Sequence, residues 1–267
     1  LNEIVVAGAY SSFTFLVGLT VVFRTSQSYS RYWDGCEAAY GMMADFFDVA
    51  SSLVAFCRGT PREKIKEVLE FQHKIIRLFS LLHALILADL ESEGTIAGSE
   101  HAYSFQLVDL EGLDSESLQT ILRVEHKVDL VFQWIQALIV EAMNFEILVL
   151  PAPILTRAFQ ELNAGMVQYH KALKIAECPF PFPYTAAAEM VLVIHWIITP
   201  IVVGTWTTHF WSASIFSFIN VFILWSMNGI AAELENPFES DLNDLDMADL
   251  QRNLNERLLM LLDSGAC

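Results

Sequence analysis

The chain has 267 residues, of which 54% are hydrophobic and 18% are charged, and its mean hydropathy is +0.42. This apolar fraction exceeds that of ordinary soluble domains and indicates a membrane protein. The formal net charge of −17 repels the phosphate backbone of a nucleic acid, so it excludes nucleic acid as a natural partner. It favours an acidic, solvated exterior outside the bilayer.

An uncharged apolar run, Ile4 to Phe23, lies near the start of the chain. About twenty such residues span the hydrocarbon core of a bilayer as a helix. Arg24 follows directly, and basic residues beside a span mark the side that faces the cytoplasm or its equivalent. Within the run, Phe15, Leu19 and Phe23 recur at every fourth position and share one face of the helix. This stripe can face lipid, a partner helix or a pore.

The next part of the chain has the pattern of helices outside the membrane. Thr60-Pro61-Arg62-Glu63 matches a capping box with proline at the first helical position, which predicts a helix from Pro61 to about Ala88. A polar stretch with several glycines, from Glu91 to Ser117, is typical of a loop.

Two further helices are predicted before the second membrane segment. The first is amphipathic and extends from about Ser117 to Leu150, where Pro151 follows. The second extends from about Ile154 to Ala176 and ends before the proline-rich run Cys178 to Pro183. Because no segment shows the alternation of a strand, the predicted fold class is all-α.

No lysine or arginine lies between Glu177 and Asn236. This interval holds two candidate spans, a short one from about Met190 to Trp206, which Pro200 should kink, and one from Phe210 to Ala232. The positive-inside rule places the block after Arg24 and the C-terminal tail on the same side of the membrane. Three spans leave the ends of the chain on opposite sides, and we expect a further helix before Leu1. No targeting peptide names the membrane.

The tail after Ala232 is rich in acids, and two uses compete for them. One is solubility, and the other is ligation of a hard cation such as calcium by Asp241 and Asp244. The four cysteines lack the short paired spacing of a zinc site and are predicted to be buried thiols.

His195 lies inside a predicted span, where an ionisable group is costly. A neutral histidine bonded to a neighbouring helix and a proton relay are the two interpretations. No phosphate loop, catalytic triad or nucleophilic cysteine pattern is evident, so an enzyme has little support.

Three blocks of the sequence resemble the bestrophin family of anion channels, and their order and spacing agree with that family. The blocks are Phe23 to Gly35, Pro179 to Tyr184, and Ala231 to Phe238 with the acids that follow. The resemblance implies a bestrophin-like protomer with transmembrane helices and a large extramembrane helical domain. It divides the chain into a pore-lining helix (1–23), an extramembrane helical domain (24–183), two transmembrane helices (184–235) and an acidic tail (236–267).

The resemblance also implies a homopentamer that passes chloride, with bicarbonate as a second candidate ion, through a central pore in a lipid membrane. By its register, Phe15, Leu19 and Phe23 form a hydrophobic neck gate, and Ile154 lines a second constriction. The alternative is a non-conducting membrane subunit of the same fold in a larger assembly. Plasma membrane and thylakoid are both compatible with the family.

Animal members bind calcium with two aspartates after an Asn-Pro-Phe motif, and the matching positions here are Asp241 and Asp244. Bacterial relatives carry similar acids without calcium control. This chain has fewer acids around these positions than the animal pattern, which lowers the expected affinity.

Overall fold

The computed structural model describes residues 2–91, 105–109, 115–239 and 243–263, and every regular element within these ranges is a helix. The all-α prediction is therefore confirmed for the part of the chain described. The chain divides into two compact units, Leu1–Asp34 with Cys178–Pro237 and Gly35–Glu177 with Phe238–Cys267. The α-helices are α1 (Asn2–Phe56), α2 (Ile65–Glu91), α4 (Ser115–Arg123), α5 (Lys127–Asn144), α6 (Ala152–Glu177), α7 (Phe182–Trp206), α8 (Phe210–Glu233) and α9 (Met247–Met260).

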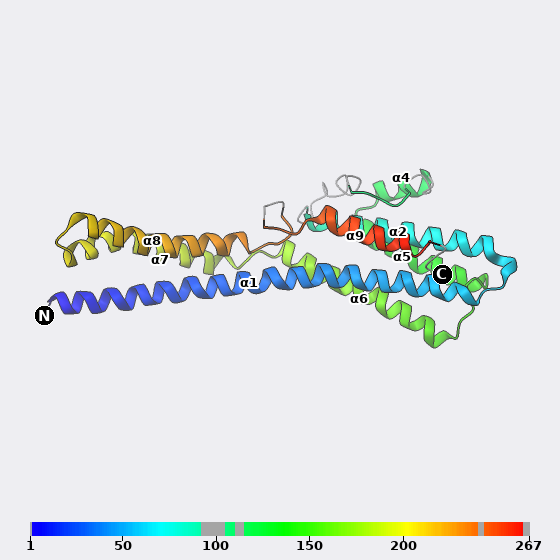
Figure 1. Ribbon diagram of the computed structural model, residues 1–267, viewed down its shortest axis with the longest axis horizontal. Helices are drawn as coiled ribbons and strands as arrows, with labels where there is room; N and C mark the ends of the chain where they lie inside the picture. Colours follow the sequence, from blue (N-terminus) through cyan, green and yellow to red (C-terminus); the bar gives the residue numbers. More distant parts are fainter. Residues whose placement is uncertain (1, 92–104, 110–114, 240–242, 264–267) are drawn as a thin grey trace. The chain divides into compact units, whose positions relative to one another are not determined.

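The first unit holds the start of α1 together with α7 and α8, which among the described residues are the three helices long and apolar enough to cross a membrane. The predicted span Ile4 to Phe23 is the first part of α1, which continues without a break to Phe56. Helices α7 and α8 lie side by side and are joined by residues 207–209, as predicted (Figure 1). Pro200 lies inside α7.

The predicted length of the second span was wrong, because α7 has 25 residues and begins at Phe182 instead of Met190. The predicted span began after Glu189, because the charge of this residue interrupts the apolar run. In the structure this side chain is exposed near the helix start, where it does not break the helix. Pro183 occupies the first turn, a position where its missing N–H has no intrahelical partner to lose.

The apolar core of the first unit is small. Val17 and Val21 of α1 are buried against Leu192 of α7, with Phe13 and Leu224 packed around them. Most other large apolar side chains of α7 and α8 point outward, as expected of helices that face lipid.

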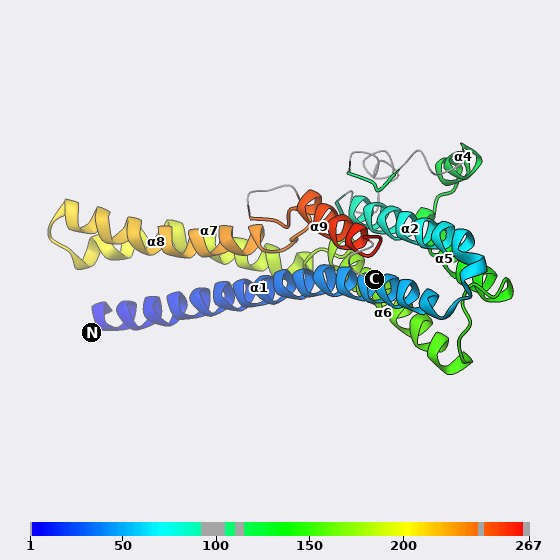
Figure 2. The same ribbon diagram turned by 45° about the vertical axis from the view of Figure 1, so that its right-hand side comes forward.

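The second unit has a large core centred on α2. Nearly every residue of α2 from Ile75 to Leu90 is buried, and a helix that is apolar on all sides must be surrounded by other helices. It packs against α5, α6 and α9 (Figures 1 and 2).

Within this unit, α6 approaches the later part of α1 closely at Gly165. A Cβ atom placed on Gly165 would lie 2.4 Å from Cε1 of Phe46, whose side chain is fully buried. The missing side chain of glycine is therefore what allows the two helices to come together here.

The predicted capping box at the start of α2 was wrong. Residues Arg62–Lys64 form a 3₁₀ turn, and α2 begins only at Ile65. The Thr60 hydroxyl donates instead to the carbonyl of Ile147, 2.5 Å away. The N-cap of the 3₁₀ turn is Pro61, and no side-chain hydrogen bond caps this turn.

The single helix predicted from Ser117 to Leu150 was also wrong, because it is broken into α4 and α5, and α5 ends at Asn144. The end of α5 is a Schellman motif, in which the amides of Glu146 and Ile147 donate to the carbonyls of Met143 and Ala142. Glu146 has φ 55°, a left-handed conformation that usually selects glycine. Because a glutamate stands there, the sequence carried no stop signal.

The sequence analysis missed α9. Its residues Leu250, Leu254 and Leu258 recur at helical spacing and are buried in the core of the second unit. Asp246 caps the helix, because its carboxylate accepts from the amide of Asp249 at 2.8 Å. Both signals are present in the sequence, within a segment that is dense in acidic residues.

The cysteine prediction was correct in part. Cys36 and Cys57 are buried and outside any disulfide, whereas Cys178 is exposed. Cys267 lies outside the described residues.

Candidate pore-lining helix and its anchoring network

The predicted neck residues Phe15, Leu19 and Phe23 lie on a face of α1 that the first unit leaves uncovered. Their side chains are 69%, 56% and 50% exposed. Val17 and Val21, which lie between them in the sequence, are buried. The stripe therefore takes no part in the packing of α1 on α7 and α8, apart from one ring contact of Phe23.

Helical geometry accounts for this division. At about 100° per residue, the stripe and the buried positions lie on faces roughly 170° apart. The buried face continues beyond the apolar core with Arg24 and Ser28. Of the three uses open to the stripe, packing within its own unit is the one this arrangement disfavours.

Arg24 is the first basic residue of the chain, and it is buried, with only 4% of its surface exposed. One guanidinium nitrogen, Nη1, donates to Oδ1 of Asn228 on α8 at 2.6 Å. The other, Nη2, lies 3.7 Å from Oε2 of Glu235. A buried charge needs such partners, because an unpaired one would cost several kcal/mol.

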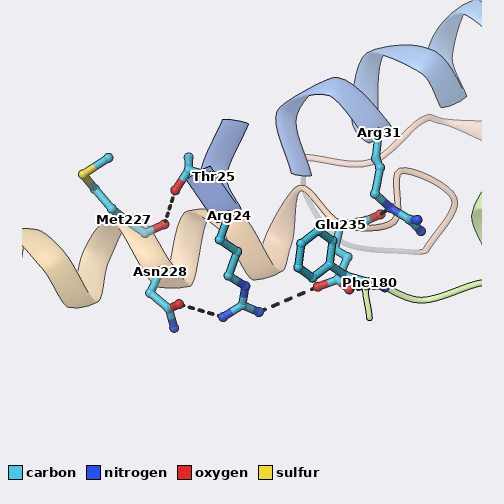
Figure 3. A network of polar contacts seen from close by, with 7 residues as sticks. All are labelled: Arg24, Thr25, Arg31, Phe180, Met227, Asn228 and Glu235. Carbon is cyan, nitrogen blue, oxygen red and sulfur yellow. Dashed lines mark hydrogen bonds and ion pairs between the residues drawn. The ribbon is translucent and has the colours of Figure 1, made fainter. Parts of the chain in front are cut away.

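Glu235 and Arg31 extend this network to the segment before α7 (Figure 3). Oε1 of Glu235 accepts from the backbone N–H of Phe180 at 2.6 Å, and the Glu235 carbonyl accepts from Nε of Arg31 at 3.2 Å. Nη2 of Arg31 donates to the carbonyl of Cys178 at 2.7 Å. The network thus ties α1 to the segment that enters α7 and to the end of α8.

The three sequence blocks that resemble the bestrophin family contribute most of this network. Arg24 and Arg31 belong to the first block, Phe180 to the second and Glu235 to the third. The contact between the blocks could not be predicted from the sequence, because residues at least 55 positions apart give no local signal of proximity.

His195 belongs to a polar and aromatic contact between α1 and α7. Its Nε2 lies 3.2 Å from Oγ1 of Thr199, and this oxygen accepts from the Tyr10 hydroxyl at 3.0 Å. The rings of Tyr10 and Phe13 each lie 6.2 Å from the imidazole. The hydrogen-bond partner of His195 lies on its own helix, and only ring contacts join the imidazole to α1, so the neutral histidine bonded to a neighbouring helix and the proton relay both stay predictions.

Ile154, the predicted second constriction, lies in the first turn of α6. Its amide donates to the carbonyl of Pro151 at 3.0 Å, and its side chain is 43% exposed. An exposed apolar side chain at a helix start is compatible with a lining role, which stays a prediction.

The predicted calcium ligands fall at the edge of the described structure. Asp241 lies outside the described residues, and Asp244 is half-buried. Across the described ranges, no three or more His, Cys, Asp or Glu side chains gather in a way that could hold a metal ion. The calcium site stays a prediction.

A second polar network, which the sequence analysis did not identify, ties α9 to α2 inside the second unit. His83 Nδ1 and Gln251 Oε1 are 2.6 Å apart, and Ser80 Oγ donates to Asn255 Oδ1 at 2.7 Å. The amides of Gln251 and Asn255 also donate to the carbonyl of Gln106. Burial lowers the pKa of His83 to about 4, so the ring is neutral at physiological pH.

The chain is similar to proteins named as channels. It is 24% identical over 230 residues to the chloroplastic voltage-dependent chloride channel 1 of Arabidopsis thaliana, covering 83% of this chain and 49% of that protein. It thus spans about half the length of that relative. A voltage-dependent anion channel-forming protein of Nostoc is 26% identical over 251 residues, 90% of this chain and 74% of that protein.

Solved structures share the fold. A crystal structure of a bacterial bestrophin homolog from Klebsiella pneumoniae superposes with a TM-score of 0.80 at 16% identity, covering 95% of this chain and 86% of that one. A family model described as bacterial/fungal bestrophin protein matches residues 5–260. The chain belongs to the bacterial and fungal bestrophin family.

Proposed function

We propose that the chain is a subunit of an anion channel that passes chloride, with bicarbonate as a second candidate ion. Family membership and the names of the Arabidopsis and Nostoc relatives support anion passage. Ion passage needs no catalytic residues, which agrees with a sequence that shows no enzymatic motif.

The exposed stripe on α1 is the observation that carries this proposal. Phe15, Leu19 and Phe23 form a bulky apolar face that is largely exposed, with one ring contact, at Phe23, in their own unit. Arranged around an axis in a homopentamer, five such faces would make three stacked apolar rings. A narrow apolar constriction empties of water and blocks ions, and it conducts when it widens or its side chains rotate.

Anion preference in this proposal comes from dipoles instead of basic pore residues. Backbone amides and helix N-termini that point towards the path favour anions but hold them weakly. The acids that give the chain its charge of −17 must then lie away from the path. We place Ile154 at a second constriction, in keeping with its exposed position at the start of α6.

The proposal also covers the membrane in which the channel lies and the cation that its acidic tail binds. The plasma membrane and the thylakoid are the two candidate membranes, and the chloroplastic name of the Arabidopsis relative supports including the thylakoid. Calcium ligation by Asp241 and Asp244 is the proposed second use of the acidic tail, alongside solubility.

Chloride flux from liposomes that contain the purified full chain tests the proposal. The wild-type protein should release chloride, and Phe15→Ala, Leu19→Ala and Phe23→Ala combined should raise the leak. The matched control is Ile215→Ala, Phe218→Ala and Phe222→Ala combined, a similarly exposed apolar triplet on α8 that should leave flux unchanged.

Two results would contradict the channel. Equal leak from the stripe variant and the control variant would remove the stripe from the gate. A silent wild-type protein that purifies as one copy within a hetero-complex would favour the non-conducting membrane subunit instead.

A further inference from the structure

Glu235 holds three segments of the first unit at one point (Figure 3). Its carboxylate pairs with Arg24 of α1 and accepts from the Phe180 amide, while its carbonyl accepts from Arg31. Arg24 is the direct neighbour of Phe23, the last residue of the stripe. The contact therefore fixes both the end of the stripe and the segment that leads into α7.

Three aromatic rings in successive contact connect that segment with the stripe. The ring centroids of Phe180 and Tyr184 are 6.1 Å apart in an edge-on arrangement. Those of Tyr184 and Phe23 are 6.2 Å apart at an interplanar angle of 42°. Both separations fall in the range in which aromatic rings attract one another beyond simple burial. Glu235 thus reaches Phe23 by two routes, through the backbone at Arg24 and through the rings.

The direction of the Phe23 ring follows from where Tyr184 stands. Tyr184 belongs to α7, and Leu192 of the same helix packs on the face of α1 opposite the stripe. A Phe23 ring that leans on Tyr184 therefore leans towards its own subunit and away from the centre of the stripe. Phenylalanine rings occupy a few staggered rotamers, so a contact that stabilises one of them shifts the population among them.

From this geometry we propose that Tyr184 and Glu235 are positioning residues for Phe23. Tyr184 draws the Phe23 ring off the axis and widens the inner ring of the neck, and Glu235 holds Tyr184 in place through Phe180. Neither residue needs to touch the permeating ion. The inference rests on the proposed channel function and adds a device that sets the width of its gate.

Removing the Tyr184 ring should lower chloride flux. In the liposome assay, Tyr184→Ala is expected to reduce flux roughly two- to tenfold, the factor that an aromatic pair contributes to an equilibrium. Tyr184→Phe keeps the ring and should match the wild type. Tyr184→Leu keeps most of the volume without the ring and should resemble Tyr184→Ala, which provides a second variant if the alanine protein fails to fold.

The decisive readout is the same change made in a Phe23→Ala background. If Tyr184 acts through Phe23, then Tyr184→Ala should change nothing once the Phe23 ring is gone. Glu235→Ala should likewise lower flux only while the Phe23 ring is present. Glu235→Gln can still accept from the Phe180 amide, so it should lower flux less. Flux is normalised to protein that elutes at the wild-type size, so a loss of folded protein does not count as a loss of flux.

Three outcomes would overturn the inference. If Tyr184→Ala conducts like the wild type, the ring does not position Phe23. If it lowers flux equally with and without the Phe23 ring, its role is structural only. A wild-type protein without flux would overturn the channel itself, and this result is distinct from the other two because it appears before any substitution is made.

Discussion

The two units of this protein differ in how much apolar surface they bury. In the first unit the apolar side chains of α7 and α8 mostly point outward, and the apolar core is little more than Val17, Val21 and Leu192. Polar contacts of Arg24, Arg31 and Thr199 add to this small core. The second unit follows the usual rule of a soluble domain, with α2 surrounded by apolar helices. A helix can thus be apolar because it faces lipid or because it lies inside a protein core, and the burial of its side chains distinguishes the two cases.

This contrast predicts that the first unit depends on a few polar contacts. Arg24→Ala removes a buried guanidinium and leaves Asn228 and Glu235 without it. Breaking a buried charged pair costs about 3 to 5 kcal/mol, and the partial exposure of Glu235 places the expected loss near the lower value. Thermal unfolding in detergent should show a clear fall in Tm.

The exposed ion pair between Glu70 and Lys74 provides the control for Arg24. Lys74→Ala should leave the Tm nearly unchanged, because surface pairs contribute little. An equally small change for Arg24→Ala would contradict the role given to the first network.

The second unit should lose stability in acid through His83. Its pKa in the folded state is about 4, below the ordinary value of 6.5, so between these values the unfolded chain binds a proton that the folded chain does not. Stability is therefore complete above about pH 6.5 and falls as the pH drops towards 4, by about 3 kcal/mol over the window. Unfolding of the wild type and of His83→Gln should be followed across this range.

The result for His83→Gln decides the cause of the acid effect. The variant lacks the titrating ring, so its stability should decline less steeply than that of the wild type between pH 6.5 and 4. Identical slopes for the two proteins would assign the decline to other groups.

Two glycine substitutions, one in each unit, test the difference in packing between the units. Gly165→Ala should destabilise the second unit by about 1 to 3 kcal/mol, because its Cβ would overlap the buried Phe46 ring. Gly229→Ala, in α8 of the first unit, meets no atom within 4 Å. It should be neutral or stabilise by up to about 1 kcal/mol, since alanine favours a helix over glycine. A Tm that falls equally for both variants would contradict the difference in packing.

Of the expected changes in Tm, the rise on adding calcium should be the smallest. If Asp241 and Asp244 bind it, the Tm should rise with added calcium by an amount set by the ratio of its concentration to its Kd. Asp241→Asn combined with Asp244→Asn should abolish the rise. A Tm that is indifferent to calcium would leave these acids only their role in solubility.

The sequence predicted the elements whose signals are local. The apolar run, the proline-rich run before Tyr184 and the loop between α7 and α8 each appear where they were expected. The break after Asn144 was missed because Glu146 occupies a position that usually belongs to glycine. Thr60 was misassigned because its acceptor, Ile147, is distant in the sequence.

The features of the candidate site also divide into those with a local sequence signal and those without one. The stripe on α1 follows from spacing alone, and the structure adds that it is uncovered. The contacts of Glu235 with Arg24 and Phe180 could not be predicted, because they depend on tertiary proximity between three distant segments.

The central claim is that the stripe lines the ion path, and access of a polar thiol reagent to position 19 tests it most directly. The background is Cys178→Ser with Cys267→Ser, which removes the cysteine that is exposed among the described residues and the one that lies outside them. Leu19→Cys is compared with Ile219→Cys, an exposed position on α8. The reagent should block chloride flux through Leu19→Cys and spare Ile219→Cys. Undiminished flux through a Leu19→Cys channel, with the reagent shown to have reacted elsewhere on an added surface thiol, would contradict the account.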